Sequence, residues 1–135
     1  DTIFAIEGKD FILVACESTV TYSIMKQKVP IIIIPANEDK IKQLDEHKLL
    51  ALAGDSANRV NFSEYVQKNM SLNRFRNNWK MSMSEAAHYI RSQLAEALRK
   101  GPYQVNCLLG GVDHEGPSLY WIDYLGTCQK VHHGA

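Results

Sequence analysis

The first two residues, Asp1 and Thr2, carry a carboxylate and a hydroxyl, groups that take part in nucleophilic and acid–base chemistry. A hydroxyl attacks a carbonyl group efficiently only when a nearby base accepts its proton. The stretch that these residues begin, DTIFAIEGKDFILVACES, also has the apolar character of two strands joined by a tight turn. The residues alone therefore leave open whether Asp1 belongs to an active site or only begins a strand.

Glu17 and Lys40 are two further charged residues that could belong to a site or serve only the structure. Glu17 follows the second apolar stretch, where it fits equally well as a pocket residue or as a charged residue that ends a strand. Lys40 is more typical of a solvated or ion-paired lysine, because lysine is rarely buried without a partner.

A metal site is the other chemistry that the sequence suggests, at Asp113, His114 and Glu115. These residues are consecutive in a stretch of turn formers, so their side chains should diverge. Metal ligands must converge on one point and need supporting partners around them. We therefore expect no metal here, and no cofactor. The pair His132 and His133 is interpreted as part of a mobile tail.

The composition is that of an ordinary globular protein, and 135 residues suit a single domain, residues 1–135. The 15 basic and 15 acidic residues cancel, which argues against nucleic-acid or membrane-surface binding. The apolar run VPIIIIPA is too short to cross a bilayer. Three cysteines without a CxxC pair, and no leader segment, favour buried thiols in a reducing compartment.

Strand signals dominate the first part of the chain. Residues 2–7 and 11–15 are predicted to form a hairpin around the turn sequence Gly8-Lys9-Asp10. Residues 19–22 have strand propensity, and VPIIIIPA is predicted to be irregular because each proline removes a backbone donor. Residues 40–43 and 48–53 are predicted to form a second pair of strands.

Helix signals follow. A first helix is predicted to begin after Asp55 or Ser56, either of which could cap it. A second is predicted to begin at Ser82, which forms an S-x-x-E capping box with Glu85, and to stop at Gly101 and Pro102. The apolar residues predicted to face the core of the two helices are Phe62, Tyr65, Val66 and Met70, then Met83, Ala87, Ile90, Leu94 and Leu98.

Two more strands are predicted at residues 103–110 and 118–123, joined by the turn-rich linker GVDHEGP. The order of strands, two helices and strands favours an α+β fold with helices packed on an antiparallel sheet. The basic residues Arg74, Arg76 and Lys80 lie among asparagines, a mixture that could suit RNA. Without a wider basic patch, a solvated helix end or a subunit contact is the favoured interpretation.

Three motifs resemble one family. ILVACES ends the first hairpin, EYVQKNMSLNRFRN lies in the first helix, and VNCLLGGVDHEGPSLYWIDYLG spans the late strands. Together they resemble proteasome beta-type subunits, and most closely the non-catalytic subunit at the fourth position of the beta ring. The resemblance covers most of the chain, roughly residues 1–125.

The resemblance implies a fold and a function. The fold would be the four-layer αββα sandwich of antiparallel sheets of the N-terminal nucleophile hydrolases. The function would be that of a structural subunit of the 20S core, in a hetero-oligomeric barrel with other beta and alpha subunits. Polypeptide substrates would pass through this assembly in ubiquitin-dependent degradation, in the cytoplasm and the nucleus.

The resemblance also implies roles for particular residues. Active members begin with a threonine whose hydroxyl attacks the peptide carbonyl, and a nearby aspartate and lysine tune it. Asp1 stands at the position of that threonine, Glu17 at that of the aspartate, and Lys40 at that of the lysine if VPIIIIPA is treated as an insertion. A carboxylate is a far weaker nucleophile toward amides, so no catalytic residue is expected.

Two alternatives remain. If Asp1 were removed, Thr2 would become terminal and the chain could be an active threonine peptidase, although Thr2 would be one residue out of register. The chain could also be a stand-alone binding module. The family runs on through further helices and strands, so the fold is expected to be incomplete at the C-terminus. The segments VPIIIIPA and CQKVHHGA also depart from the family pattern.

Overall fold

The computed structural model describes residues 2–17, 19–22, 25–28 and 40–135. The segment VPIIIIPA and Asp1, on which two of the predictions fall, lie outside the described residues. The elements in chain order are β1 (Ile3–Glu7), β2 (Ile12–Cys16), β3 (Thr19–Tyr22), β4 (Met25–Lys28), β5 (Ile41–Asp45), β6 (Lys48–Gly54), α1 (Ser56–Asn77), α2 (Met83–Ala97), β7 (Val105–Asp113), β8 (Gly116–Ile122), β9 (Cys128–Val131) and β10 (His133–Gly134).

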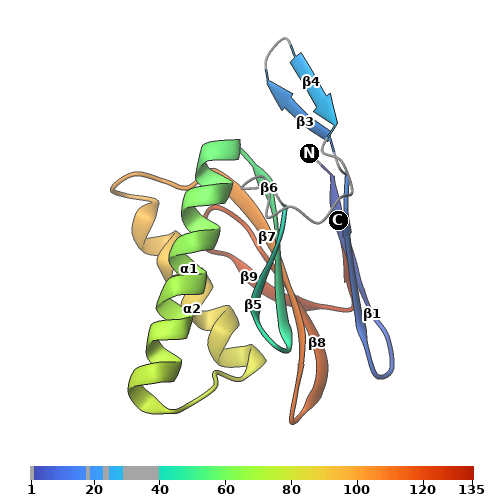
Figure 1. Ribbon diagram of the computed structural model, residues 1–135, viewed down its shortest axis with the longest axis vertical. Helices are drawn as coiled ribbons and strands as arrows, with labels where there is room; N and C mark the ends of the chain where they lie inside the picture. The colour runs from blue at the N-terminus through green and yellow to red at the C-terminus, as the bar shows by residue number, and fades with distance from the viewer. Residues whose placement is uncertain (1, 18, 23–24, 29–39) are drawn as a thin grey trace.

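The strands form antiparallel sheets. A five-stranded sheet has the order β5-β6-β7-β8-β9, a three-stranded sheet has the order β10-β1-β2, and β3 pairs with β4. Both helices cover one face of the five-stranded sheet, and the three-stranded sheet lies against the other face (Figure 1). The prediction of an α+β fold with two antiparallel sheets is thus confirmed. The described residues contain one helix layer of the predicted sandwich.

The helices form as their sequence signals predict. Asp55 caps α1 by accepting a hydrogen bond from the Asn58 backbone nitrogen at 3.1 Å. Ser82 and Glu85 form the complete capping box of α2. Both caps satisfy N–H groups that the first turn of a helix leaves without partners.

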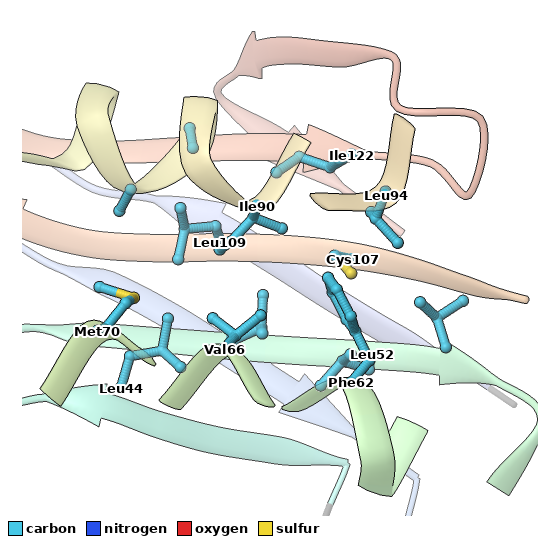
Figure 2. Packing of buried hydrophobic residues seen from close by; sticks show 14 of the residues in the cluster. Leu44, Leu52, Phe62, Val66, Met70, Ile90, Leu94, Cys107, Leu109 and Ile122 are labelled. Carbon is cyan, nitrogen blue, oxygen red and sulfur yellow. The ribbon is translucent and has the colours of Figure 1, made fainter. Parts of the chain in front are cut away.

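The main core lies between the helices and the five-stranded sheet. Figure 2 shows Phe62, Val66 and Met70 of α1 facing the same layer of side chains as Ile90 and Leu94 of α2. On the sheet, this layer meets Leu52, Cys107, Leu109 and Ile122. Leu98, which follows the last residue of α2, is only half-buried, and the predicted spacing was wrong at Tyr65, which is 42% exposed. Its hydroxyl lies on the helix surface, where it donates to Gln93 Oε1 at 3.0 Å.

A second core lies between the two sheets. It is built from Ile3, Ala5, Ala51, Leu108 and Leu119. Side chains alternate across a strand, so Ile3 and Ala5 point into this layer while Phe4 and Ile6 point outward. The hairpin at the start of the chain is therefore one wall of the inter-sheet core.

Two predictions about the last third of the chain were wrong. The linker GVDHEGP is mostly strand: β7 continues to Asp113 and β8 begins at Gly116, so only two residues form the turn. The histidine tail is ordered, since His133 lies in β10 and pairs with Ile6 of β1. Turn-forming residues and a position near the end of the sequence favour loops locally. In both segments, however, hydrogen bonds to neighbouring strands hold the backbone as β-strand.

The outer face of the three-stranded sheet carries exposed apolar side chains, including Phe4 (46%), Ile6 (45%) and Leu13 (51%). Ile6 and Leu13 are directly paired across β1 and β2. Contiguous apolar surface of this kind promotes association.

We expect the 135-residue chain to self-associate, and Leu13→Lys to shift it toward monomer in sedimentation velocity. Lys68→Leu, on exposed α1, should not reduce association. Equal sedimentation of wild type and Leu13→Lys would contradict this.

Candidate functional site

The pairing of β1 with β2 brings the start of the chain beside Glu17. Ile3 pairs with Cys16, and one residue further the Glu17 nitrogen donates to the Thr2 carbonyl oxygen at 3.0 Å. The Thr2 nitrogen in turn donates to Glu17 Oε1 at 3.0 Å. Thr2 and Glu17, separated by 15 positions in the sequence, are therefore held together by their backbones and by one carboxylate.

Lys40 reaches the same carboxylate from the other sheet. It immediately precedes β5, and its carbonyl oxygen accepts a hydrogen bond from the Leu52 nitrogen at 2.9 Å. Its side chain is 3% exposed, and Nζ lies 3.2 Å from Glu17 Oε1. The structure thus brings together three of the four predicted site residues, Thr2, Glu17 and Lys40. The fourth, Asp1, lies outside the described residues.

The charge state of this group follows from its contacts. The hydrogen bond from Lys40, and then the charge of its ammonium, hold the pKa of Glu17 below its usual value. Glu17 is thus a carboxylate near neutral pH, and it accepts two donors.

Of the three residues considered as metal ligands, Asp113 at the end of β7 has a structural role. Asp113 Oδ2 accepts the first backbone N–H of α2, from Met83, at 2.9 Å, and Oδ1 accepts the Glu115 nitrogen at 2.9 Å. His114 and Glu115 are exposed. In the described part of the chain, no group of three or more His, Cys, Asp or Glu side chains is placed to hold a metal ion.

Most of the basic run at the end of α1 is balanced locally. Arg74 and Lys80 both lie near Glu46 of the β5–β6 turn, at 4.0 and 3.3 Å. The hydrogen bond from Lys80, together with both positive charges, lowers the pKa of Glu46. This favours the interpretation of the run as a helix end tied to a turn. Neither helix of the described residues has the length and apolar character needed to cross a membrane.

Sequence reasoning missed two features of this end of the molecule. One is a pocket of 810 Å³ where the two hairpin turns meet the connection between the helices; its lining includes His47, Trp79, Val112 and His114. The other is the ion pair of Lys48 with Asp45, which is 4% and 12% exposed. The i, i+3 spacing of opposite charges around a turn could have indicated the pair, whereas the pocket joins segments that only folding brings together.

Acid should weaken the folded state, because four carboxylates of the described residues, those of Glu17, Asp45, Glu46 and Asp113, have lowered pKa values. Lys40 lowers the pKa of Glu17. For Asp45 and Asp113 burial acts in the opposite direction, but hydrogen bonds from Lys48 and from backbone N–H groups outweigh it. Their stabilisation is present above the ordinary carboxylate pKa, about 4, and is lost as the pH falls through the lowered values.

We therefore expect the urea midpoint of unfolding to decrease steadily from roughly pH 5 to pH 3. Asp113→Asn should reduce this pH dependence, because it removes one of the titrating groups. A midpoint that is unchanged over this interval would contradict the argument.

The sequence predicts buried thiols, and this prediction holds for Cys107. Cys107 is fully buried, and this burial raises the pKa of its thiol. Cys16 and Cys128 are half-buried. Burial raises the pKa of the Cys128 thiol as well, so neither Cys107 nor Cys128 is an activated thiolate that could replace a hydroxyl nucleophile.

Comparison with known proteins identifies the family. The chain matches the family described as "Proteasome subunit" over residues 1–135. It is 46% identical to "Proteasome subunit beta type-2-A" of Arabidopsis thaliana, 42% to "Proteasome subunit beta type-2" of Dictyostelium discoideum and 36% to "Proteasome subunit beta type-4" of Saccharomyces cerevisiae.

These alignments cover 99–100% of the chain and 63%, 66% and 66% of the three relatives, respectively. The chain thus spans less than two thirds of the length of the Arabidopsis relative. The match nevertheless covers both sheets, both helices and the site at Glu17 and Lys40. The chain belongs to the proteasome beta-subunit family.

Proposed function

We propose that this chain is a non-catalytic, structural subunit of the beta ring of the 20S proteasome core. The observation that carries the proposal is the aspartate at position 1, where active members of the family have their threonine nucleophile. An aspartate carboxylate has no hydroxyl to attack an amide and no proton to pass to a local base. The contribution of the chain to peptide hydrolysis is then to form part of the chamber wall.

The geometry around Glu17 supports this proposal. The acid and the lysine that the resemblance associates with catalysis are present and in contact. The carboxylate of this pair also accepts the peptide N–H of Thr2. These contacts tie the acid and the lysine to the entry of β1, which fits a structural role for the pair.

The proposed partners are other beta subunits and alpha subunits, and the proposed location is the cytoplasm and the nucleus. The named relatives are proteasome subunits, which supports extending assembly to this chain. Polypeptides would reach the chamber in ubiquitin-dependent degradation and be cut by other subunits. Permanent contacts of this kind are usually large and apolar, which fits the exposed Phe75 (84%) and Trp79 (61%).

The deciding experiment is native purification of the core through a tag on a different core subunit, followed by intact-mass measurement of this chain. We expect the chain in stoichiometric amount, with Asp1 retained. Its absence from the assembly would overturn the proposal.

The competing function, an active threonine peptidase, requires Thr2 to become terminal. An electrophilic inhibitor that reacts with N-terminal threonine separates the two functions. We expect no added mass on this chain at an inhibitor concentration that saturates the catalytic subunits of the same preparation. An adduct on Thr2 would replace the structural proposal with the catalytic one.

A further inference from the structure

A groove lies between the two helices, beside the connection that joins them. It is a pocket of 500 Å³ lined by the last turns of α1, by Met81 of the connection and by Tyr89 of α2. In Figure 1 this connection joins the lower ends of the two helices. None of the residues that line the groove belongs to a strand, so it is separate from the site at Glu17 and Lys40.

Three asparagines follow one another along α1 in this groove: Asn69, Asn73 and Asn77. Hydrogen bonds fix their amide groups, since Asn69 Nδ2 donates to the Tyr65 carbonyl oxygen at 2.8 Å and Asn77 Nδ2 donates to Asn73 Oδ1. A carboxamide has two N–H donors and an oxygen with two lone pairs. Each of the three therefore keeps hydrogen-bonding capacity for a partner.

The spacing of these amides suits the backbone of an extended peptide. Positions four residues apart on a helix are separated by about 6 Å along its axis. In an extended chain every second residue presents its N–H and C=O to the same side, at a repeat of about 6.6–6.8 Å. Three amides in a row can thus contact alternate residues of one extended segment.

The other lining residues of the groove are mainly apolar. Leu72 is 43% exposed, whereas Met81 and Tyr89 are half-buried and pack against the main core. An apolar side chain that entered between these three residues would remove apolar surface, including that of Leu72, from water. The groove therefore favours a partner that supplies one apolar side chain.

The charge of the two helices favours an acidic partner. Residues 56–100 contain eight lysines and arginines but only three acidic residues. Two of these acids pair with a lysine four positions further along the chain, and the third caps α2. Arg76, which lines the groove, is exposed, and among the described residues no acidic side chain forms an ion pair with it. Its guanidinium can therefore bind a carboxylate from outside.

We propose that this groove binds an extended, acidic segment of a partner protein, which inserts one apolar side chain between Leu72, Met81 and Tyr89. The three asparagines hold the backbone of the segment, and Arg76 pairs with one of its aspartate or glutamate side chains. This inference goes beyond the structural role in the beta ring and does not rest on it, because residues of this chain alone form the groove.

The experiment measures the fluorescence anisotropy of a labelled peptide of about six residues, a length that covers three amides one helical turn apart. The peptide is blocked at both ends, carries acidic residues on both sides of one leucine, and is titrated with the full-length protein. We expect saturable binding. Binding should become about tenfold weaker when the acids are replaced by their amides, or the leucine by serine.

Substitutions in the groove separate its charge from its amides. Arg76→Gln should weaken binding of the acidic peptide about fivefold and leave binding of the amide peptide unchanged, because only a charge pair is lost. Asn73→Ala should weaken binding of both peptides about threefold, because it removes a contact to the backbone. Thermal unfolding checks that each variant keeps the fold.

Arg74→Gln is the matched control. It makes the same change of charge two residues from Arg76, but Arg74 lies outside the groove and is 4.0 Å from Glu46. This variant should bind the acidic peptide as tightly as wild type does.

Absence of saturable binding by the acidic peptide would overturn the proposal. Equal weakening by Arg74→Gln and Arg76→Gln would also overturn it, because that pattern means a diffuse attraction to basic charge. Displacement of the labelled peptide by single-stranded RNA as effectively as by unlabelled peptide would assign the surface to nucleic acid instead. None of these results bears on recovery of the chain with a tagged core subunit. Failure of this proposal and failure of the proposed function are therefore distinguishable.

Discussion

Asp45→Ala is expected to destabilise the fold by roughly 3–5 kcal/mol, because it leaves the ammonium of Lys48 buried without its carboxylate. Lys48 Nζ lies 2.7 Å from Asp45 Oδ2, and the lysine side chain is 4% exposed. The same carboxylate accepts the His47 nitrogen at 2.7 Å and so also holds the β5–β6 turn. The measurement is the free energy of unfolding in urea at neutral pH.

Lys48→Met and the double variant complete a double-mutant cycle. Replacing both members of a buried pair by apolar groups is often nearly neutral. We therefore expect the double variant to be closer in stability to wild type than Asp45→Ala alone, with a large coupling energy between the two positions. If the free-energy changes of the two single variants simply add up in the double variant, the ion pair itself contributes nothing to stability.

Gly111→Ala is expected to have the second largest effect, roughly 3 kcal/mol of destabilisation from overpacking. A Cβ at Gly111 would overlap the carbonyl oxygen of His47 and would lie 2.7 Å from Met83 Sδ. The first contact is backbone of the adjacent strand entry, and the second is a buried side chain at the start of α2. The His47 carbonyl cannot move away without disturbing the β6–β7 pairing, in which the next residue, Lys48, lies opposite Gly111.

Gly101→Ala is the control for this prediction. A Cβ at Gly101 meets no atom within 4 Å. Alanine should leave stability unchanged or raise it by about 0.5 kcal/mol through the unfolded state. If thermal unfolding shows the two alanine variants to be equally stable, close approach at Gly111 is not what the fold requires.

Local signals in the sequence were sufficient to predict the elements that are held by residues close to one another in the chain. The capping box at Ser82 and Glu85 satisfies the first turn of α2 with residues from that same turn. The turn at Gly8-Lys9-Asp10 closes a hairpin between adjacent strands, and apolar spacing placed Phe62, Val66 and Met70 on the buried face of α1. In each case the interacting residues are close in the chain, so the pattern is visible without the fold.

Long-range pairing decided the rest. Asp113 appeared to be a turn or metal-type residue, but its carboxylate caps a helix that begins 30 positions earlier in the chain. His133 appeared to be part of a tail, but it pairs with Ile6 at the other end of the sequence. Tyr65 had core spacing but points to the surface, because the face that a helix buries depends on where the sheet and the second helix lie.

For the candidate site, too, the sequence predicted one part and only the tertiary structure showed the other. The motifs of the sequence determined the family and singled out Asp1, Thr2, Glu17 and Lys40, and the resemblance predicts that Asp1 stands at the position of the nucleophile. Only the tertiary structure decided that Glu17 meets a buried Lys40 and the amide of Thr2 at once. The physical reason is that these three groups belong to two different sheets, and no local pattern reports which strand ends meet when the two sheets stack.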